Sequence, residues 1–201
     1  EVSQSPLLLG GGNVPGNLAL VPSVEFPTVI SVANIDATYS SAKVFSGYFD
    51  SGKCYTYIYN TTETLRHFNP TRFSPSRECL TAGEWSGNFL NWVSNSAIDM
   101  LRLALSGGDR YIDTPTLTVL QRAVLPNGDP ICMWNSSNFP AKRLQRNGGG
   151  TGKFWGAVPT KMITEAGAND IWVANTLNRI YFRASNSNPG DRKSTRLNSS
   201  H

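Results

Sequence analysis

The sequence predicts an α/β domain in which helices cover a sheet and long irregular loops join the elements. Two short apolar, β-branched runs, at residues 17–21 and 28–34, are typical of buried strands. Between Ser86 and Gly107, apolar side chains recur at steps of three and four, which is the pattern of a helix with one apolar face. Because such a face must be buried against another layer, we expect this helix to cover the sheet.

The composition is typical of a secreted, loop-rich globular protein. The chain has 201 residues, 39% of them hydrophobic and 16% charged, which is sufficient for one domain with a sizeable core. Asn, Ser, Thr and Gly are frequent, and the first three disfavour long helices because their side chains compete for backbone hydrogen bonds. No run of eighteen apolar residues is present, so we expect no membrane span.

We expect three segments along the chain. Residues 1–16 end in "GGGNVPG" and are expected to form a flexible leader. Residues 17–190 are expected to form the domain. The absence of an initiator methionine and of a signal peptide indicates a processed chain or a piece of a longer one.

The last segment, residues 191–201, reads "DRKSTRLNSSH". These residues can be encoded by a nucleotide string that matches a widely used short-read sequencing adapter over every codon. We therefore predict a translated adapter and exclude it from fold reasoning. The formal net charge of the whole chain is +4, and without this tail 15 basic and 13 acidic residues leave +2. A body so near neutrality excludes the electrostatic footprint of a nucleic-acid-binding protein.

The middle of the chain predicts a hairpin followed by two helices. Residues 44–49 and 54–59 flank "DSGK", which is typical of a hairpin turn, and a strand over 54–59 places its three tyrosines on one face. In the first helix Ser86 is the expected N-cap and Gly107 the expected end. Its apolar stripe consists of Phe89, Leu90, Val93, Ala97, Met100, Leu101 and Ala104.

The second predicted helix covers residues 113–125, with Thr114 as its cap and Pro115 at its first position. Residues 154–158 are expected to form a short strand. Residues 170–185 predict two strands joined by a turn near Asn175–Asn178.

Because the first helix should pack on the sheet, we expect Leu101→Asp to place an unpaired charge in the core.

Three cysteines allow two interpretations. In an exported protein Cys54 and Cys79 would form a disulfide across the irregular segment 60–78, contributing about 3 kcal/mol by restricting the unfolded chain. Cys132 would then be the odd one. The alternative is a zinc site made by the three thiols and His67, although neither a CxxC nor an HxxxH spacing supports it.

Motifs for nucleotide chemistry are incomplete. "NGGGTGKF" at 147–154 resembles a phosphate-binding loop, but Asn147 replaces its first glycine and Phe154 stands where Ser or Thr should meet magnesium. "GGGNVPG" begins like a dinucleotide fingerprint, but Pro15 occupies the position of its third glycine. We therefore predict no cofactor in this chain.

Catalytic residues are not predicted either. His67 is the only histidine outside the tail, and no G-x-S-x-G motif accompanies it. Four carboxylates could supply a pair for glycoside hydrolysis, but their spacing selects none: Glu63, Glu78, Glu84 and Asp99. Five tryptophans could stack on sugars or form the core: Trp85, Trp92, Trp134, Trp155 and Trp172.

Several stretches together resemble the N-terminal region of the PilC/PilY family, the tip-associated adhesion and biogenesis proteins of bacterial type IV pili. They are "GGGNVPGNLALVPSVEFPTVISVAN", "VFSGYFDSGKCYTY", "RHFNPTR", "WSGNFLNWVSNSAIDMLRLALSGGDRYIDTPT" and "FWGAVPTKM". The most specific is "WSGNFLNW", which begins at Trp85. The resemblance extends in patches from about Ser5 to Pro189.

This resemblance implies export to the outer membrane, cell surface or pilus tip of a Gram-negative bacterium. It implies a non-enzymatic role in pilus biogenesis, adhesion and twitching motility. The implied partners are pilin or minor pilins, a host or abiotic surface, and the protein's own C-terminal domain. Family members carry a calcium site in a C-terminal β-propeller, which is absent from this sequence and is expected in a missing part of the protein.

The resemblance also implies a divergent domain similar to a von Willebrand factor type A domain. Such domains hold a metal with Asp-x-Ser-x-Ser directly after the first strand. Here Pro22 follows the strand and the aspartate is absent, so Ser23 and Glu25 are weak, degenerate ligand candidates and we expect no bound metal. The alternative to the pilus interpretation is an extracellular carbohydrate-binding or hydrolase module with an aromatic cleft.

Overall fold

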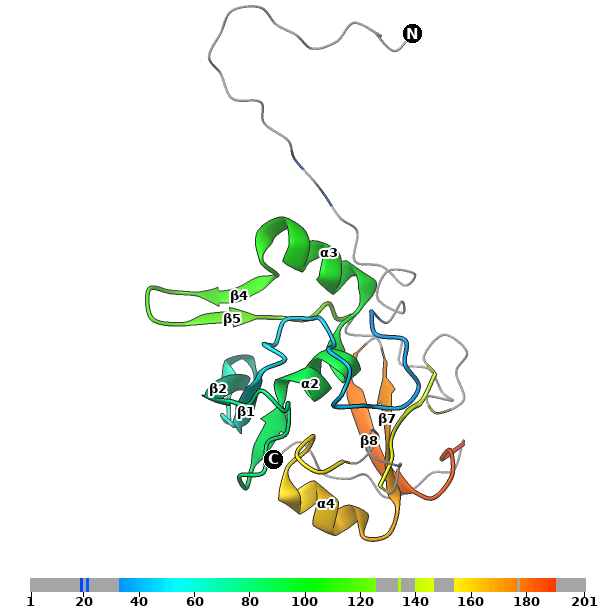
Figure 1. Cartoon of the computed structure of the whole chain (residues 1–201). Coiled ribbons are helices and arrows are strands. Elements are labelled where there is room, and N and C mark those ends of the chain that lie inside the picture. Colours follow the sequence, from blue (N-terminus) through cyan, green and yellow to red (C-terminus); the bar gives the residue numbers. More distant parts are fainter. Residues whose placement is uncertain are drawn as a thin grey trace, which may run out of the picture.

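The computed structural model describes residues 33–125, 140–146, 154–176 and 178–190, together with positions 19, 21 and 134. Helix α2 (Gly87–Ser94) lies in the middle, between two antiparallel three-stranded sheets (Figure 1). A third, two-stranded sheet and helix α3 (Ala97–Ser106) lie together at one end of the molecule, and α4 (Thr160–Ala166) lies at the other. The α/β class is therefore confirmed as a mixed α/β domain with small sheets. The predicted strands at 17–21 and 28–34 lie almost entirely outside the described residues.

The first sheet has the strand order β2-β1-β3. Strand β1 (Lys53–Ile58) confirms the strand expected over 54–59, and it pairs with β2 (His67–Phe73) and β3 (Glu84–Ser86). The short 3₁₀ helix η1 (Glu63–Leu65) joins β1 to β2. The predicted hairpin between 44–49 and 54–59 is wrong, because within the described residues 44–49 form no strand.

The segment 44–49 is held by asparagine side chains of α2 instead of by a neighbouring strand. The Asn88 carboxamide accepts the Phe45 N–H at 2.8 Å, and the Asn91 carboxamide accepts the Phe49 N–H at 2.9 Å. Asn91 also donates to the backbone oxygens of Phe45 and Phe49. Gly47 permits this approach, since a Cβ there would lie 2.3 Å from the Asn91 Oδ1. The polar face of α2 thus supplies the hydrogen bonds that a sheet would otherwise provide.

The single helix predicted between Ser86 and Gly107 is two helices, α2 and α3, separated at Asn95 and Ser96. Ser86 caps the first and Gly107 ends the second with φ of 77°, as expected. The break follows from a local capping box, in which the Asp99 carboxylate accepts hydrogen bonds from the Ser96 N–H at 2.9 Å and the Ser96 hydroxyl at 2.8 Å. Ser96 therefore starts a new helix where the apolar period alone predicts continuation.

Because the helix breaks, the second half of its apolar stripe is not core. Leu101 is 45% exposed, whereas Ile98 on the same helix is 3% exposed. The expectation that Leu101 packs on the sheet is wrong. We now expect Leu101→Asp to change the unfolding free energy by no more than about 0.5 kcal/mol. Ile98→Asp should cost at least about 3 kcal/mol, because it removes buried methyl groups and buries a charge. Urea denaturation of both variants tests this contrast, and equal losses would contradict it.

The predicted helix at 113–125 is also wrong, since these residues contribute to a hairpin of β4 (Arg110–Asp113) and β5 (Thr118–Leu120). Thr114 caps a turn here, not a helix: its hydroxyl oxygen accepts the Leu117 N–H at 3.0 Å. Thr or Asp followed by Pro starts turns as well as helices, and the β-branched residues after it favour a strand.

The other three-stranded sheet has the order β6-β7-β8 and covers the other side of α2. Strands β7 (Asp170–Asn175) and β8 (Ile180–Ser185) confirm the predicted pair, and β6 (Lys142–Leu144) joins their edge. Residues 154–158, expected as a strand, form turns. The core between the sheets is dominated by aromatic side chains and includes Tyr39, Trp85, Phe89, Trp92 and Phe154. No helix in the described part of the chain is long and apolar enough to cross a membrane.

Candidate functional site

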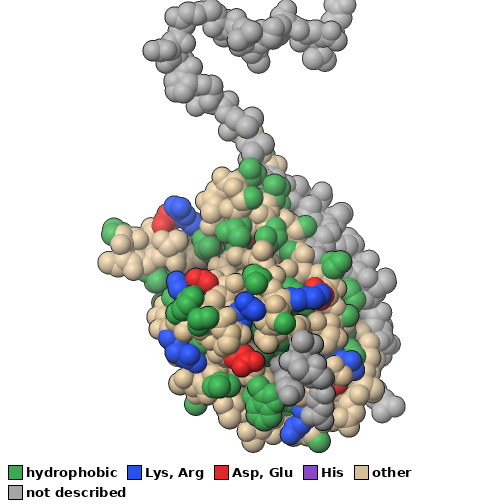
Figure 2. All heavy atoms as spheres, viewed as in Figure 1, with side chains coloured by type: hydrophobic (Ala, Val, Ile, Leu, Met, Phe, Trp, Pro, Cys, Tyr) green, Lys and Arg blue, Asp and Glu red, His purple; other side chains and the backbone are tan. Residues whose placement is uncertain are grey.

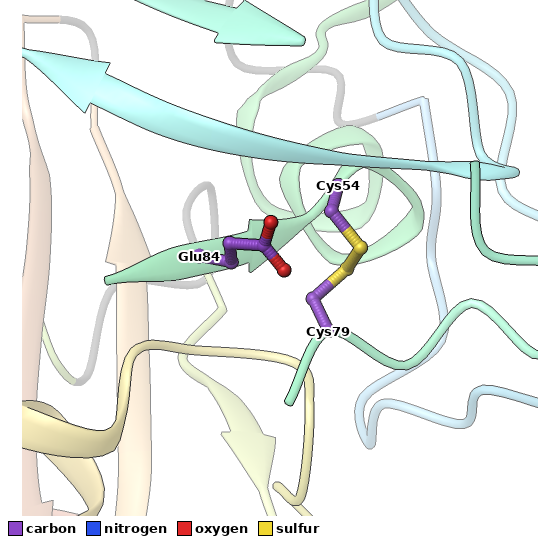
Figure 3. A group of neighbouring side chains, drawn as sticks. All are labelled: Cys54, Cys79 and Glu84. Atoms are coloured by element: carbon purple, nitrogen blue, oxygen red, sulfur yellow. A yellow bond between two sulfur atoms is a disulfide. The ribbon is translucent and has the colours of Figure 1, made fainter. Parts of the chain in front are cut away.

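The structure brings Cys54 and Cys79 together in a disulfide, with the Glu84 carboxylate beside it (Figure 3). Donor atoms of these three residues lie within 4.8 Å of one another. Both sulfurs are bonded to each other, so neither is available as a thiolate for zinc. The Glu84 carboxylate accepts hydrogen bonds from the Thr71 hydroxyl at 2.8 Å and the Arg72 Nε at 3.0 Å. The cluster is therefore a structural crosslink, and the disulfide interpretation is favoured over the zinc site.

The other polar candidates have structural partners or are separate from one another. Asp99 is fully buried, caps α3 and accepts the Ala123 N–H at 2.7 Å. His67 has its Nδ1 at 2.8 Å from the backbone oxygen of Leu65. Glu63 lies on the exposed helix η1. Hydrogen bonding of this kind accounts for Asp99 and His67 without a catalytic role.

Some predicted sites fall outside the described residues. They include the degenerate metal candidates Ser23 and Glu25, the third cysteine Cys132, the glycine-rich loop and the adapter-like tail at 191–201. The interpretations given for them from the sequence remain predictions.

Of the tryptophans, Trp85 and Trp92 belong to the core and are 7% and 1% exposed. Trp155 is 52% exposed, and Trp134 and Trp172 are half-buried. The guanidinium of Arg143 lies 5.8 Å from the ring centroid of Trp172. The tryptophans are thus dispersed, and they do not form the row of exposed rings expected of a sugar platform.

The described residues form a groove of about 800 Å³ between the first sheet and the β4–β5 hairpin. We call it the aromatic groove. One side is formed by η1, β1 and β2, the opposite side by residues 117–122 and Tyr111, and the base by α2 and β8. Figure 2 shows the hairpin standing out from the body, with apolar side chains exposed near its base. The volume is within the range of ligand sites in proteins.

The base of the aromatic groove is a rigid network of aromatic rings. Phe68 packs against Tyr57, Phe49 and Trp85 with ring centroids 5.2, 5.7 and 5.9 Å apart. Trp85 in turn contacts Phe182 of β8 at 5.9 Å. The contacts of Phe68 with Phe49 and with Trp85 are edge-to-face, a geometry that fixes ring orientation as well as burying area. The groove therefore presents a preformed apolar surface.

The polar groups of the groove lie around this apolar base. Burial raises the pKa of Tyr57. Burial, which is the larger cause, and the nearby Asp99 carboxylate together raise the pKa of Tyr48 to about 12. Both hydroxyls stay protonated at neutral pH, and the Tyr48 hydroxyl oxygen accepts the Asp109 N–H at 3.4 Å. The ionisable side chains other than tyrosine are Glu63, Arg66, His67 and Arg122. The arginines outnumber the single carboxylate, so the groove is weakly cationic.

Lys142 is a further buried polar residue that the sequence did not single out. It is 4% exposed and donates hydrogen bonds to the backbone oxygens of Asn34 and Trp92. Its ammonium lies 4.8 Å from the centroid of the Trp92 ring. Burial lowers the pKa of Lys142 to about 7, and the Asp36 carboxylate opposes this shift. Through these hydrogen bonds Lys142 connects β6 to α2 and to residue 34. Lys142 does not line the aromatic groove.

The fold and its groove define a small α/β domain with a preformed apolar surface. The family model described as "PilY1 homolog, small alpha/beta domain" matches residues 36–138. A relative from Xylella fastidiosa, "Type IV pilus biogenesis factor PilY1 homolog", is 47% identical over 150 residues, which is 72% of this chain. A second protein of that name and organism is 34% identical over 93 residues, 46% of this chain. The chain belongs to the PilY1 homologue family, and the resemblance inferred from its motifs is confirmed.

The matched parts are a small share of these relatives, 12% of the length of the first and 6% of the second. No solved structure matches the chain.

Proposed function

We propose that the chain is part of a non-enzymatic surface protein that acts in type IV pilus biogenesis. The observation that carries this proposal is its 47% identity to a relative named as a pilus biogenesis factor. The disulfide between Cys54 and Cys79 supports the proposed location outside the cytoplasm, because disulfides persist in oxidising compartments. In this proposal the protein acts at the outer membrane, cell surface or pilus tip.

The finer parts of the proposal concern the longer polypeptide. They are that residues 17–190 belong to an N-terminal pilus-protein domain with a divergent von Willebrand A-like relationship, and that a calcium site lies in a C-terminal propeller. They also include roles in adhesion and twitching motility. Pilin or minor pilins, a host or abiotic surface, and the protein's own C-terminal domain are the proposed partners. The aromatic groove is the proposed contact surface, because a preformed apolar surface with a polar rim is typical of recognition sites.

A genetic experiment tests the proposal. In a bacterium that encodes the full-length protein, we expect deletion of the gene to reduce surface piliation, attachment and twitching. Complementation with Leu117→Asp, which puts a charge at the 37% exposed groove residue, should fail to restore piliation. The matched control Leu105→Asp lies on α3 outside the groove, is 55% exposed, and should restore it. Normal piliation in the deletion strain would contradict the pilus role.

The second candidate is a carbohydrate-binding module or hydrolase, and the aromatic groove is the observation that favours it. Tyr57 and Tyr111 line this groove and offer rings to a sugar. The buried Trp85 packs its ring into the core, which weakens this candidate. Titration with neutral oligosaccharides, followed by tryptophan fluorescence, tests it. Saturable binding that Tyr111→Ala abolishes would favour this candidate over a protein-contact surface.

A further inference from the structure

One side of the aromatic groove is the free edge of a strand. Residues 117–122 all line the groove, although successive side chains of a strand point to opposite faces. The run includes all three residues of β5, Thr118–Leu120, and consecutive strand residues line one space when the strand presents its edge to that space. Among the described residues β5 has a single partner, β4, in a two-stranded sheet, so no described strand pairs with its other edge. This edge faces the groove.

The hydrogen bonds of the hairpin identify the amides that point outward. The Gln121 N–H donates to the Asp109 oxygen at 2.8 Å, and the Leu117 oxygen accepts the Thr114 N–H at 2.9 Å, both across the hairpin. In an antiparallel pair the bonded residues alternate, and the register shift of this pair lies on β4, between Arg110 and Ile112, so the N–H groups of Thr118 and Leu120 point away from β4. Within the described part of the chain, no backbone oxygen outside the β4–β5 ladder accepts either of these two amides.

The side facing this edge is apolar and weakly cationic. Tyr57 and Phe68 present their rings from the first sheet, and Ile180 and Phe182 add apolar surface from β8. An extended chain lying along β5 would therefore turn every second side chain toward aromatic rings. The excess of arginine over carboxylate in the groove, from Arg66 and Arg122 against Glu63, favours an occupant with acidic residues.

We propose that the aromatic groove binds an extended segment of a partner protein, which adds to the edge of β5 as a third strand. The segment has apolar side chains at alternate positions and acidic residues at its ends. Six residues of extended chain, about 20 Å, match the edge formed by residues 117–122. The addition would also complete a sheet that as an isolated two-stranded hairpin is only marginally stable. This inference rests on the proposed role as a contact surface and specifies how the partner binds.

Amide hydrogen exchange of the full 201-residue chain tests the inference. The probe is an octapeptide in which valine and threonine alternate between two terminal aspartates, at millimolar concentration. We expect it to slow exchange at Thr118 and Leu120 at least tenfold and to leave the amides of Val119 and Gln121, which already face β4, nearly unchanged. Uniform protection, or none, would overturn the proposal. Protection of Thr118 and Leu120 before the peptide is added would also overturn it, because the chain itself would then fill the groove.

A matched pair of variants makes the test independent of folding. Thr118→Pro removes the outward N–H of the first β5 residue, a position where an edge strand tolerates proline. Thr118→Val removes the hydroxyl but keeps the N–H. We expect both to unfold within a few degrees of the parent, and only Thr118→Pro to weaken peptide binding tenfold or more. Equal binding by both variants would overturn strand addition. The pilus role would be unaffected by that result, since it depends on the piliation of the deletion strain.

Discussion

Replacing Asn91 by leucine is expected to lower the unfolding free energy by about 4 kcal/mol. Asn91 is 1% exposed, and its carboxamide accepts the Phe49 N–H and donates to the oxygens of Phe45 and Phe49. Leucine has a similar size but cannot form these bonds, so three backbone groups would lose their partner. Each unpaired buried group costs about 1–3 kcal/mol. The loss should exceed that of a simple core truncation, because the loop 44–49 has no strand partner to replace the side chain.

Equilibrium urea unfolding, followed by tryptophan fluorescence, measures this loss. Asn69→Leu is the matched control, since Asn69 is exposed on β2 and the same substitution there should change stability by less than about 0.5 kcal/mol. Asn91→Asp provides a second comparison, because it keeps one acceptor oxygen for Phe49 and loses the two donated bonds. A loss below about 1 kcal/mol for Asn91→Leu would show that the loop finds other partners.

The asparagine contacts also explain why the hairpin strand predicted at 44–49 is wrong. The run "VFSGYF" carries β-branched and aromatic residues, and a following Gly-containing turn and strand complete the signal for a hairpin. Its backbone partners are side chains more than forty residues away, on the polar face of α2. A polar helix face is normally solvated, so the pattern of α2 gives no sign that its asparagines are buried.

Three predictions that depended on local chemistry are confirmed: the two helix caps and the β7–β8 pair. Ser86 and Gly107 delimit helical structure because capping depends on the residue and its immediate neighbours. The pair β7–β8 could be predicted from the sequence because both strands carry β-branched and aromatic residues on either side of a short turn. The single helix predicted between these two caps is wrong, because a new helix begins after Ser96. Ser96 and Asp99 carry a capping signal of their own.

The aromatic groove could not be predicted because its parts are joined only by the tertiary fold. Strand periodicity places Tyr57 on a face, but no pattern in the sequence indicates that this face meets Phe68, Phe182 and the edge of β5. The helix predicted over 113–125 would have no unpaired amides in its interior, so this prediction could not indicate the free edge of β5. A correct hairpin assignment was therefore a precondition for recognising the groove.

Removal of the disulfide is expected to lower the unfolding free energy by about 3 kcal/mol. Cys54 and Cys79 are 25 residues apart, and the entropy of closing a loop of that length in the unfolded chain gives this magnitude. The bond joins the central strand β1 to the irregular segment that follows β2. The Cys79 N–H also donates to the Gly156 oxygen at 2.8 Å, so the crosslink holds residue 79 against the turns at 154–158.

The double variant Cys54→Ala, Cys79→Ala isolates this contribution when it is compared with the parent chain in the presence and absence of a reductant. The parent should lose about 3 kcal/mol on reduction, and the double variant should have about the stability of the reduced parent under both conditions. Cys132 is retained in both proteins, so any effect of the reductant on the double variant would report a bond that involves Cys132. If reduction leaves the parent as stable as before, native contacts around Gly156 hold the loop without the crosslink. In that case the disulfide would restrict the unfolded chain far less than loop closure predicts.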